Sequence, residues 1–190
     1  RDYMLKQVDF DGVNDYIDVG NGEGVNFGTS NFSISTWINT SDADGAIYSS
    51  YDASTPYAHL RLSSGKVYVY LRSGTEQAWA STATVNDGSW HHIAVSVNKS
   101  SGVLMYIDGA LESLSSTGTI GSVGDLGSSK TYNIGRHPSN ATYLVGQISA
   151  LAVYNDAKDA DFIYAQYAKG LFGDWSADTN LSGYWKMGNG

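Results

Sequence analysis

Three strand-like stretches in the first half of the chain carry the side chains best suited to bind a ligand. Each alternates apolar with polar or aromatic residues, the pattern of a strand with one buried face, and they cover residues 57–62, 66–72 and 76–80. If two-residue turns connect them, one face collects His59, Arg61, Tyr68, Tyr70 and Trp79. Aromatic rings stack on a sugar or another flat ligand, while guanidinium and imidazole groups supply directional donors. We therefore expect this set, the aromatic stripe, to be a ligand-binding face.

The turns decide which residues of the stripe lie side by side. Ser64-Gly65 and Ser73-Gly74 have the length and chemistry of tight hairpin turns. The first turn pairs Arg61 with Tyr68, and a two-residue second turn places Trp79 beside Tyr68. The stripe also has a structural alternative, because aromatic cross-strand pairs stabilise a sheet surface by about 0.2 to 1 kcal/mol each. In that alternative the helix or a neighbouring subunit covers the stripe.

The composition is that of a single all-β domain. Among 190 residues there are five Trp, fourteen Tyr and twenty-two Gly but only two Pro, which is typical of many short strands and tight turns. No stretch approaches the roughly 20 apolar residues that cross a membrane, so we expect no membrane insertion. A net charge of −8 opposes binding to phosphate backbones, so nucleic acid is not an expected partner. The chain contains no cysteine and therefore no disulfide.

Strand patterns recur along most of the chain, and one segment breaks them. Further strand-like runs cover residues 4–10, 15–19, 32–39, 46–51, 90–98, 103–108, 130–135 and 143–154. Segment 157–169 has helical spacing instead, with Asp156 as the expected N-cap and Gly170 as the expected stop. We expect a single domain over 1–190, in which residues 171–190 return to the sheet or lead to a following module.

Several short phrases occur in an order that belongs to a known fold. They are Phe10-Asp11-Gly12, Phe32-Ser33-Ile34-Ser35-Thr36-Trp37-Ile38, Trp90-His91-His92-Ile93, Tyr106-Ile107-Asp108-Gly109 and Tyr132-Asn133-Ile134-Gly135. In this order the chain resembles the laminin G-like and pentraxin-like domains among the concanavalin A-like jelly rolls. The resemblance implies an all-β jelly-roll sandwich of two antiparallel sheets with one short helix near the C-terminus. It also implies a family that binds glycans, extracellular proteins or other surface ligands, often through calcium.

The resemblance does not extend to the pentraxin-type calcium ligands. In that pattern, acidic side chains follow the Ile-Gly strand, whereas here the phrase reads Gly135-Arg136-His137-Pro138-Ser139 without a carboxylate. Calcium takes six to eight oxygen ligands, usually including carboxylates. The remaining acidic fragments are Asp42 with Asp44, and Asp11 with Asp15. We therefore expect no cofactor, and any calcium ion would have to use one of these two fragments.

The chain also lacks the residues for the chemistry of related enzymes. A glycosidase needs two carboxylates flanking the scissile bond, and the laminarinase-type motif of the superfamily is Glu-x-Asp-x-x-Glu. The three glutamates, Glu23, Glu76 and Glu112, are too far apart in sequence to form that motif. Adjacent His91 and His92 look like a metal pair, but neighbours on a strand point to opposite faces. We expect no enzymatic activity and no catalytic or metal-binding residue.

These expectations converge on a binding module. We expect a lectin-like domain of a larger extracellular or virion protein, with a glycan or a surface receptor as its partner. The alternative is a structural module that decorates a virus particle and binds neighbouring subunits. The closing phrase, residues 183–188, resembles segments that adjoin laminin G-like modules in phage structural proteins, which keeps both alternatives open.

Overall fold

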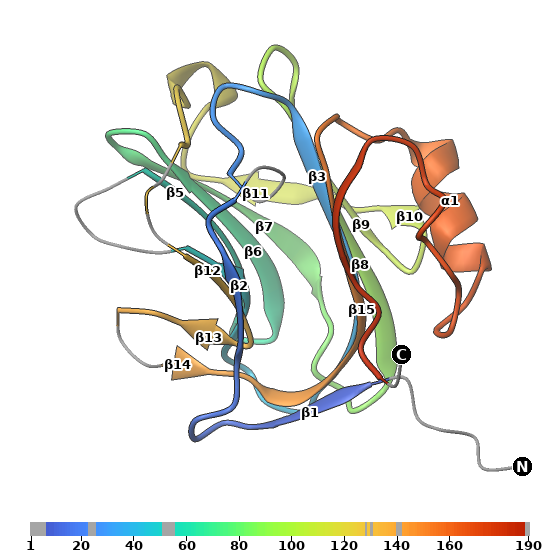
Figure 1. The fold of residues 1–190 in the computed structure, drawn as a ribbon. Coiled ribbons are helices and arrows are strands. Elements are labelled where there is room, and N and C mark those ends of the chain that lie inside the picture. Colours follow the sequence, from blue (N-terminus) through green and yellow to red (C-terminus); the bar gives the residue numbers. More distant parts are fainter. Residues whose placement is uncertain are drawn as a thin grey trace, which may run out of the picture.

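Two antiparallel sheets packed face to face make up most of the protein (Figure 1). The computed structural model describes residues 7–22, 26–50, 56–127, 129, 131–139 and 142–188. Sheet A has the order β1-β15-β3-β8-β9-β10, and β16 pairs with the second half of β15. Its strands are β1 (Val8–Asp11), β3 (Phe32–Asn39), β8 (Trp90–Asn98), β9 (Gly102–Ile107), β10 (Ala110–Leu111), β15 (Val145–Tyr154) and β16 (Leu181–Trp185).

Sheet B carries the three stretches that hold the aromatic stripe. Its order is β11-β7-β6-β5-β4-β12-β2, and a small hairpin of β13 and β14 packs beside β4. The strands are β2 (Ile17–Gly20), β4 (Gly45–Ser49), β5 (Tyr57–Ser63), β6 (Lys66–Arg72), β7 (Glu76–Thr84), β11 (Leu114–Ser116), β12 (Tyr132–Ile134), β13 (Arg136–His137) and β14 (Thr142–Tyr143). A 3₁₀ turn, Ile120–Ser122, follows β11 in a loop that contains Gly118, Gly121, Gly124 and Gly127.

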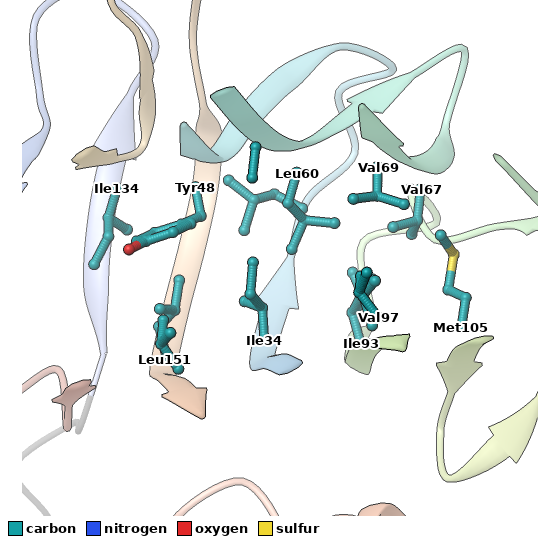
Figure 2. Close-up of a cluster of buried hydrophobic side chains, with 14 of the residues drawn as sticks. Ile34, Tyr48, Leu60, Val67, Val69, Ile93, Val97, Met105, Ile134 and Leu151 are labelled. Carbon is teal, nitrogen blue, oxygen red and sulfur yellow. The ribbon is translucent and has the colours of Figure 1, made fainter. Parts of the chain in front are cut away.

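The core lies between the facing surfaces of the two sheets. Apolar side chains from alternate positions of each strand interdigitate there, as the period-two pattern requires (Figure 2). Ile34, Ile93 and Met105 come from sheet A, and Leu60 and Val69 meet them from sheet B. All five side chains are buried. This packing leaves the other surface of β5 and β6 to point away from the core.

The helix α1 (Ala160–Ala168) packs on the outer surface of sheet A, away from sheet B (Figure 1). It begins later than expected: Asp159 is the N-cap, and its carboxylate accepts a hydrogen bond from the Phe162 amide at 2.9 Å. The predicted cap, Asp156, is wrong, because the Lys158 amide donates to the Ser33 hydroxyl on β3 and delays the first helical turn. Gly170 follows the helix with a φ of +75°, in agreement with the expected stop. No helix among the described residues is long and apolar enough to span a membrane.

The C-terminal stretch folds back onto the outer surface of sheet A. Trp175 is fully buried there beside Trp37 and Tyr154, and β16 then pairs with β15. The predicted two-sheet sandwich with one helix is therefore confirmed within the described residues. The short strands β10, β11, β13 and β14 were not predicted, because two or three residues are too few to show a period.

Candidate functional site

The β5–β6 hairpin has the register that its turn residues predict. Ser64 and Gly65 have φ values of +52° and +75°, so they form the left-handed two-residue turn that suits a twisted hairpin. The cross-strand pairs on its outer surface are Tyr57 with Arg72, His59 with Tyr70, and Arg61 with Tyr68. Tyr68 and Tyr70 also stack on each other, with ring centroids 5.5 Å apart. Four of the five residues of the aromatic stripe thus lie together on the outer surface of sheet B.

Trp79 is the exception, and its predicted placement on this surface is wrong. The β6–β7 connection pairs Arg72 with Glu76 and therefore contains three residues, 73–75, instead of two. That single extra residue shifts the register and exchanges the two faces of β7. Trp79 pairs with Val69 and lies in the core, only 7% exposed. The small side chains of Ala78 and Ala80 take the outer positions beside the two tyrosines.

A pocket of about 420 Å³ opens on this outer surface. It is lined by side chains from four strands and one turn: Tyr57, His59, Arg61, Tyr70, Glu76, His137 and Ser139. We call it the outer-face pocket. Of the predicted ligand-binding residues, His59, Arg61 and Tyr70 line it directly, whereas Tyr68 supports it through its stack on Tyr70.

Sequence reasoning did not include the four other lining residues. Tyr57 and Glu76 were detectable in principle, because both flank Arg72 in the cross-strand pairing. His137 and Ser139 carry no local signal, since only the packing of the β13–β14 hairpin beside β4 brings them to the pocket. A contact between segments more than 70 residues apart cannot be derived from residue periodicity.

Hydrogen bonds fix the polar side chains at both ends of the pocket. At one end, the Tyr57 hydroxyl donates to the Glu76 carboxylate, and the Arg72 guanidinium lies 5.9 Å from the Tyr57 ring. At the other end, Arg61 Nη2 lies 3.5 Å from Asp44 Oδ1, whose side chain is half exposed. The bond between Tyr57 and Glu76 holds its end of the lining in place before any ligand arrives, which lowers the entropic cost of binding, whereas the exposed Arg61–Asp44 pair is weak.

The two histidines at the back of the pocket are uncharged at neutral pH. Their ring centroids are 4.7 Å apart, and His59 Nδ1 shares a hydrogen bond of 2.7 Å with the Ser49 hydroxyl. Burial, with help from His137 and Arg61, holds the pKa of His59 well below its usual value. Burial and the Arg61 charge lower the pKa of His137 to about 4. Burial also raises the pKa of Tyr70, so its hydroxyl stays protonated and can donate.

The residues at the position of the pentraxin-type calcium ligands do not fit that ion. Arg136 stands there with its guanidinium 4.6 Å from the Tyr16 ring, and neighbouring His137 is a nitrogen donor. The described residues contain no group of three or more His, Cys, Asp or Glu side chains that could hold a metal. Of the two acidic fragments, Asp44 pairs with Arg61 and Asp11 accepts the Val13 amide at 2.8 Å. Independence from calcium remains a prediction.

His91 and His92 lie as the alternation of a strand requires. His91 lies at the start of β8 on the surface of sheet A that faces sheet B, with Nδ1 2.8 Å from Asp108 and Nε2 3.2 Å from Asp87. His92 is fully buried beneath α1, and its Nε2 shares a hydrogen bond of 2.8 Å with the Ser35 hydroxyl. The two imidazoles serve different surfaces of sheet A and cannot share a metal ion.

Comparison with known proteins identifies the family of this fold. The profile described as the concanavalin A-like lectin/glucanases superfamily matches residues 11–163. No curated protein sequence matches the chain. Among solved structures, domains LG4-5 of the mouse laminin α1 chain align with a TM-score of 0.56 at 20% identity, over 76% of this chain and 46% of that one.

Two further structures cover nearly the whole of this chain. The heptameric SAP-like pentraxin from Limulus polyphemus aligns with a TM-score of 0.63 at 14% identity, over 94% of this chain and 93% of that one. A Bacteroides ovatus protein, provisionally described as carbohydrate-binding, aligns with a TM-score of 0.65 at 17% identity, over 96% and 52%. The chain thus spans about half the length of the laminin and Bacteroides chains. At these identities the likeness shows the fold alone.

Proposed function

The chain belongs to the concanavalin A-like lectin/glucanases superfamily, and within it we propose that this protein is a non-catalytic module that binds a glycan or a surface receptor through the outer-face pocket. We also propose that this module is part of an extracellular or virion-surface protein.

The observation that carries the proposal is the composition of the outer-face pocket. Tyr70 offers a partly exposed aromatic ring on which a sugar can stack, with Tyr68 stacked beside it, and Arg61 and the Tyr70 hydroxyl offer donors at its edges, whereas Tyr57 is buried. Most of these groups stand on paired strands, so the lining is rigid, and an exposed sheet surface needs no such concentration of aromatic side chains. A hollow with rings and fixed donors is what recognition of a polar, flat-faced ligand requires.

The same lining favours binding over hydrolysis. Glu76 is the single carboxylate among the described lining residues, and it accepts a hydrogen bond from the Tyr57 hydroxyl. Glycoside hydrolysis needs an acid and a second carboxylate about 5 to 9.5 Å away. The neutral histidines could move a proton, but the lining residues that the structure describes include no second carboxylate to act as nucleophile or base. We therefore propose a module without catalytic activity.

The similar structures support the proposal by analogy. The Bacteroides protein is provisionally described as carbohydrate-binding, and a further similar structure is the receptor-binding domain of botulinum neurotoxin D, with a TM-score of 0.67 at 16% identity. Shared fold does not by itself imply shared function, so the pocket is the stronger part of the argument.

A glycan array tests the proposal with two matched variants. We expect the wild-type protein to bind a reproducible set of glycans, and Tyr70→Ala to lose that binding because it removes a ring of the pocket. Tyr164→Ala is the control, since Tyr164 is 60% exposed on α1, on the opposite side of the sandwich. Self-association in sedimentation experiments, with no glycan bound by the wild type, would instead favour the assembly alternative.

A further inference from the structure

Three nitrogen-bearing side chains converge at one end of the outer-face pocket. His59 and Arg61 are two residues apart on β5 and therefore point to the same side of the strand. His137 reaches the pocket from β13, and its ring lies 4.7 Å from that of His59. Each of these groups can donate a hydrogen bond, and each is cationic when protonated.

The nearby acidic side chains do not balance this end. Glu76 lies beside Tyr57, four residues along β5 from Arg61, which corresponds to about 13 Å of strand. Asp44 does approach Arg61, at 3.5 Å, but its side chain is 54% exposed, and such exposed pairs are weak and screened by water. This end of the pocket is therefore electropositive, although the chain as a whole carries a net charge of −8.

The other described groups around the two imidazoles are neutral or turned away. Ser49, Ser139 and Tyr70 are uncharged, and Tyr70 meets the His59 ring edge-on at 5.9 Å. Arg136 precedes His137 on β13, but its guanidinium stacks on the Tyr16 ring outside the pocket lining. Among the described residues, Arg61 is then the charged side chain that lowers the pKa of both imidazoles.

From this arrangement we propose that the ligand carries an anionic group, a carboxylate or a sulfate on an acidic glycan, which binds between Arg61 and the imidazoles of His59 and His137. This inference rests on the proposed function and names its ligand class. A carboxylate or sulfate accepts several hydrogen bonds at once, and a guanidinium beside N–H donors satisfies them. An uncharged sugar hydroxyl would bring no negative charge to the Arg61 guanidinium and would accept fewer hydrogen bonds.

Such binding takes up a proton. In the free protein burial and Arg61 keep both imidazoles neutral, whereas an anion between them favours the protonated form. By linkage, a ligand that raises the pKa of a group binds more tightly as the pH falls toward that pKa. If one imidazole gains about two pKa units in the complex, affinity rises roughly fourfold from pH 7.5 to pH 5.5. A sugar carboxyl stays ionised over that range, as its pKa is near that of an α-carboxyl, about 3.5.

The test compares acidic glycans with their neutral counterparts. Uronic-acid oligosaccharides, their methyl esters and sulfated oligosaccharides are titrated by calorimetry at pH 7.5 and pH 5.5, in two buffers of different ionisation enthalpy. We expect the acidic forms to bind at least tenfold more tightly than the esters, with proton uptake. The uronic and sulfated arms distinguish carboxylate from sulfate.

Variants separate the inference from the proposed function. Arg61→Gln should weaken the binding of acidic glycans at least tenfold, whereas Lys66→Gln, which removes the same charge from the same outer surface of sheet B but outside the pocket, should not. His137→Gln keeps an N–H donor but cannot titrate, so the gain in affinity at pH 5.5 should shrink. Equal binding of esters and acids, with no proton uptake, would overturn the inference and leave the proposed function standing. Binding of no glycan of any kind would overturn both.

Discussion

Trp79 pairs with Val69 across β6 and β7, and this pairing directs the indole into the core. The register follows from the three-residue connection between Arg72 and Glu76. With one residue fewer, the same side chain would lie on the outer surface beside Tyr68. The position of a single turn residue therefore decides whether Trp79 contributes to stability or to binding.

Replacement of Trp79 by Ala should destabilise the protein strongly. Because the indole is buried in the main core, its loss leaves a cavity, and we expect a cost of about 3 to 5 kcal/mol in the free energy of unfolding. Urea unfolding followed by circular dichroism measures this cost. Leu111→Ala is the control and should change stability by less than about 0.5 kcal/mol, since Leu111 is 60% exposed. A cost below about 1 kcal/mol for Trp79→Ala would contradict the register.

His137 should make stability fall in mild acid. Its pKa is about 4 in the folded protein and near 6.5 when unfolded, so the unfolded chain binds more protons between these values. The free energy of unfolding therefore decreases as the pH falls from about 6.5 to 4, by up to about 3 kcal/mol from this group. Unfolding midpoints of the wild type and His137→Gln, measured across this range, should diverge in slope. Parallel pH profiles would show that His137 titrates normally.

His91, in contrast, should make the stability of the protein fall as the pH rises. Hydrogen bonds and the charges of Asp108 and Asp87 raise the pKa of His91 above its usual value, although burial opposes them. The folded protein then binds the proton more tightly, so the stabilisation is full below about pH 6.5 and is lost as the pH rises through the raised pKa. We expect His91→Gln to cost more stability at pH 5.5 than at pH 8.5. Denaturation at both values measures the difference, and an equal cost at both would refute the ion pairs.

The sequence predicts those elements whose position depends on residues close to them in the chain. The register of β5 and β6 follows from Ser64-Gly65, which forms a turn that fixes the pairing by itself. The sequence did not predict Asp159 as the N-cap of α1. Asp156 is an equally suitable cap residue, and what excludes it is a tertiary hydrogen bond from the Lys158 amide to the Ser33 hydroxyl. The β5–β6 turn and the stop of α1 depend on neighbouring residues, whereas the start of α1 depends on a distant one, Ser33.

The lining residues of the outer-face pocket also fall into a predicted and an unpredicted group. His59, Arg61 and Tyr70 were predicted because they share one hairpin, in which alternation fixes the face. His137 was not, since it follows Gly135, whose φ of +83° turns the chain away from β12 toward the pocket. Glycine is also required there because a Cβ added at position 135 would lie only 2.3 Å from the Phe10 ring, and this contact is set by the tertiary structure. The sequence therefore predicts the residues of this pocket that share the β5–β6 hairpin, but not those that the distant β13–β14 hairpin contributes.

Removal of calcium should leave the stability of the protein nearly unchanged. The position that holds acidic ligands in the pentraxin pattern carries Arg136 and His137, and Asp44 is engaged by Arg61. A cation would meet the Arg136 guanidinium at the first position, and the Arg61 guanidinium would repel it at the second. Since a ligand stabilises only the state that binds it, a protein without a calcium site gains nothing from the ion. Melting curves in EDTA and in millimolar calcium should agree within about 2 °C, whereas a shift of about 10 °C would show a tightly bound ion. Asp44→Asn and Asp11→Asn would then identify which acidic fragment holds it.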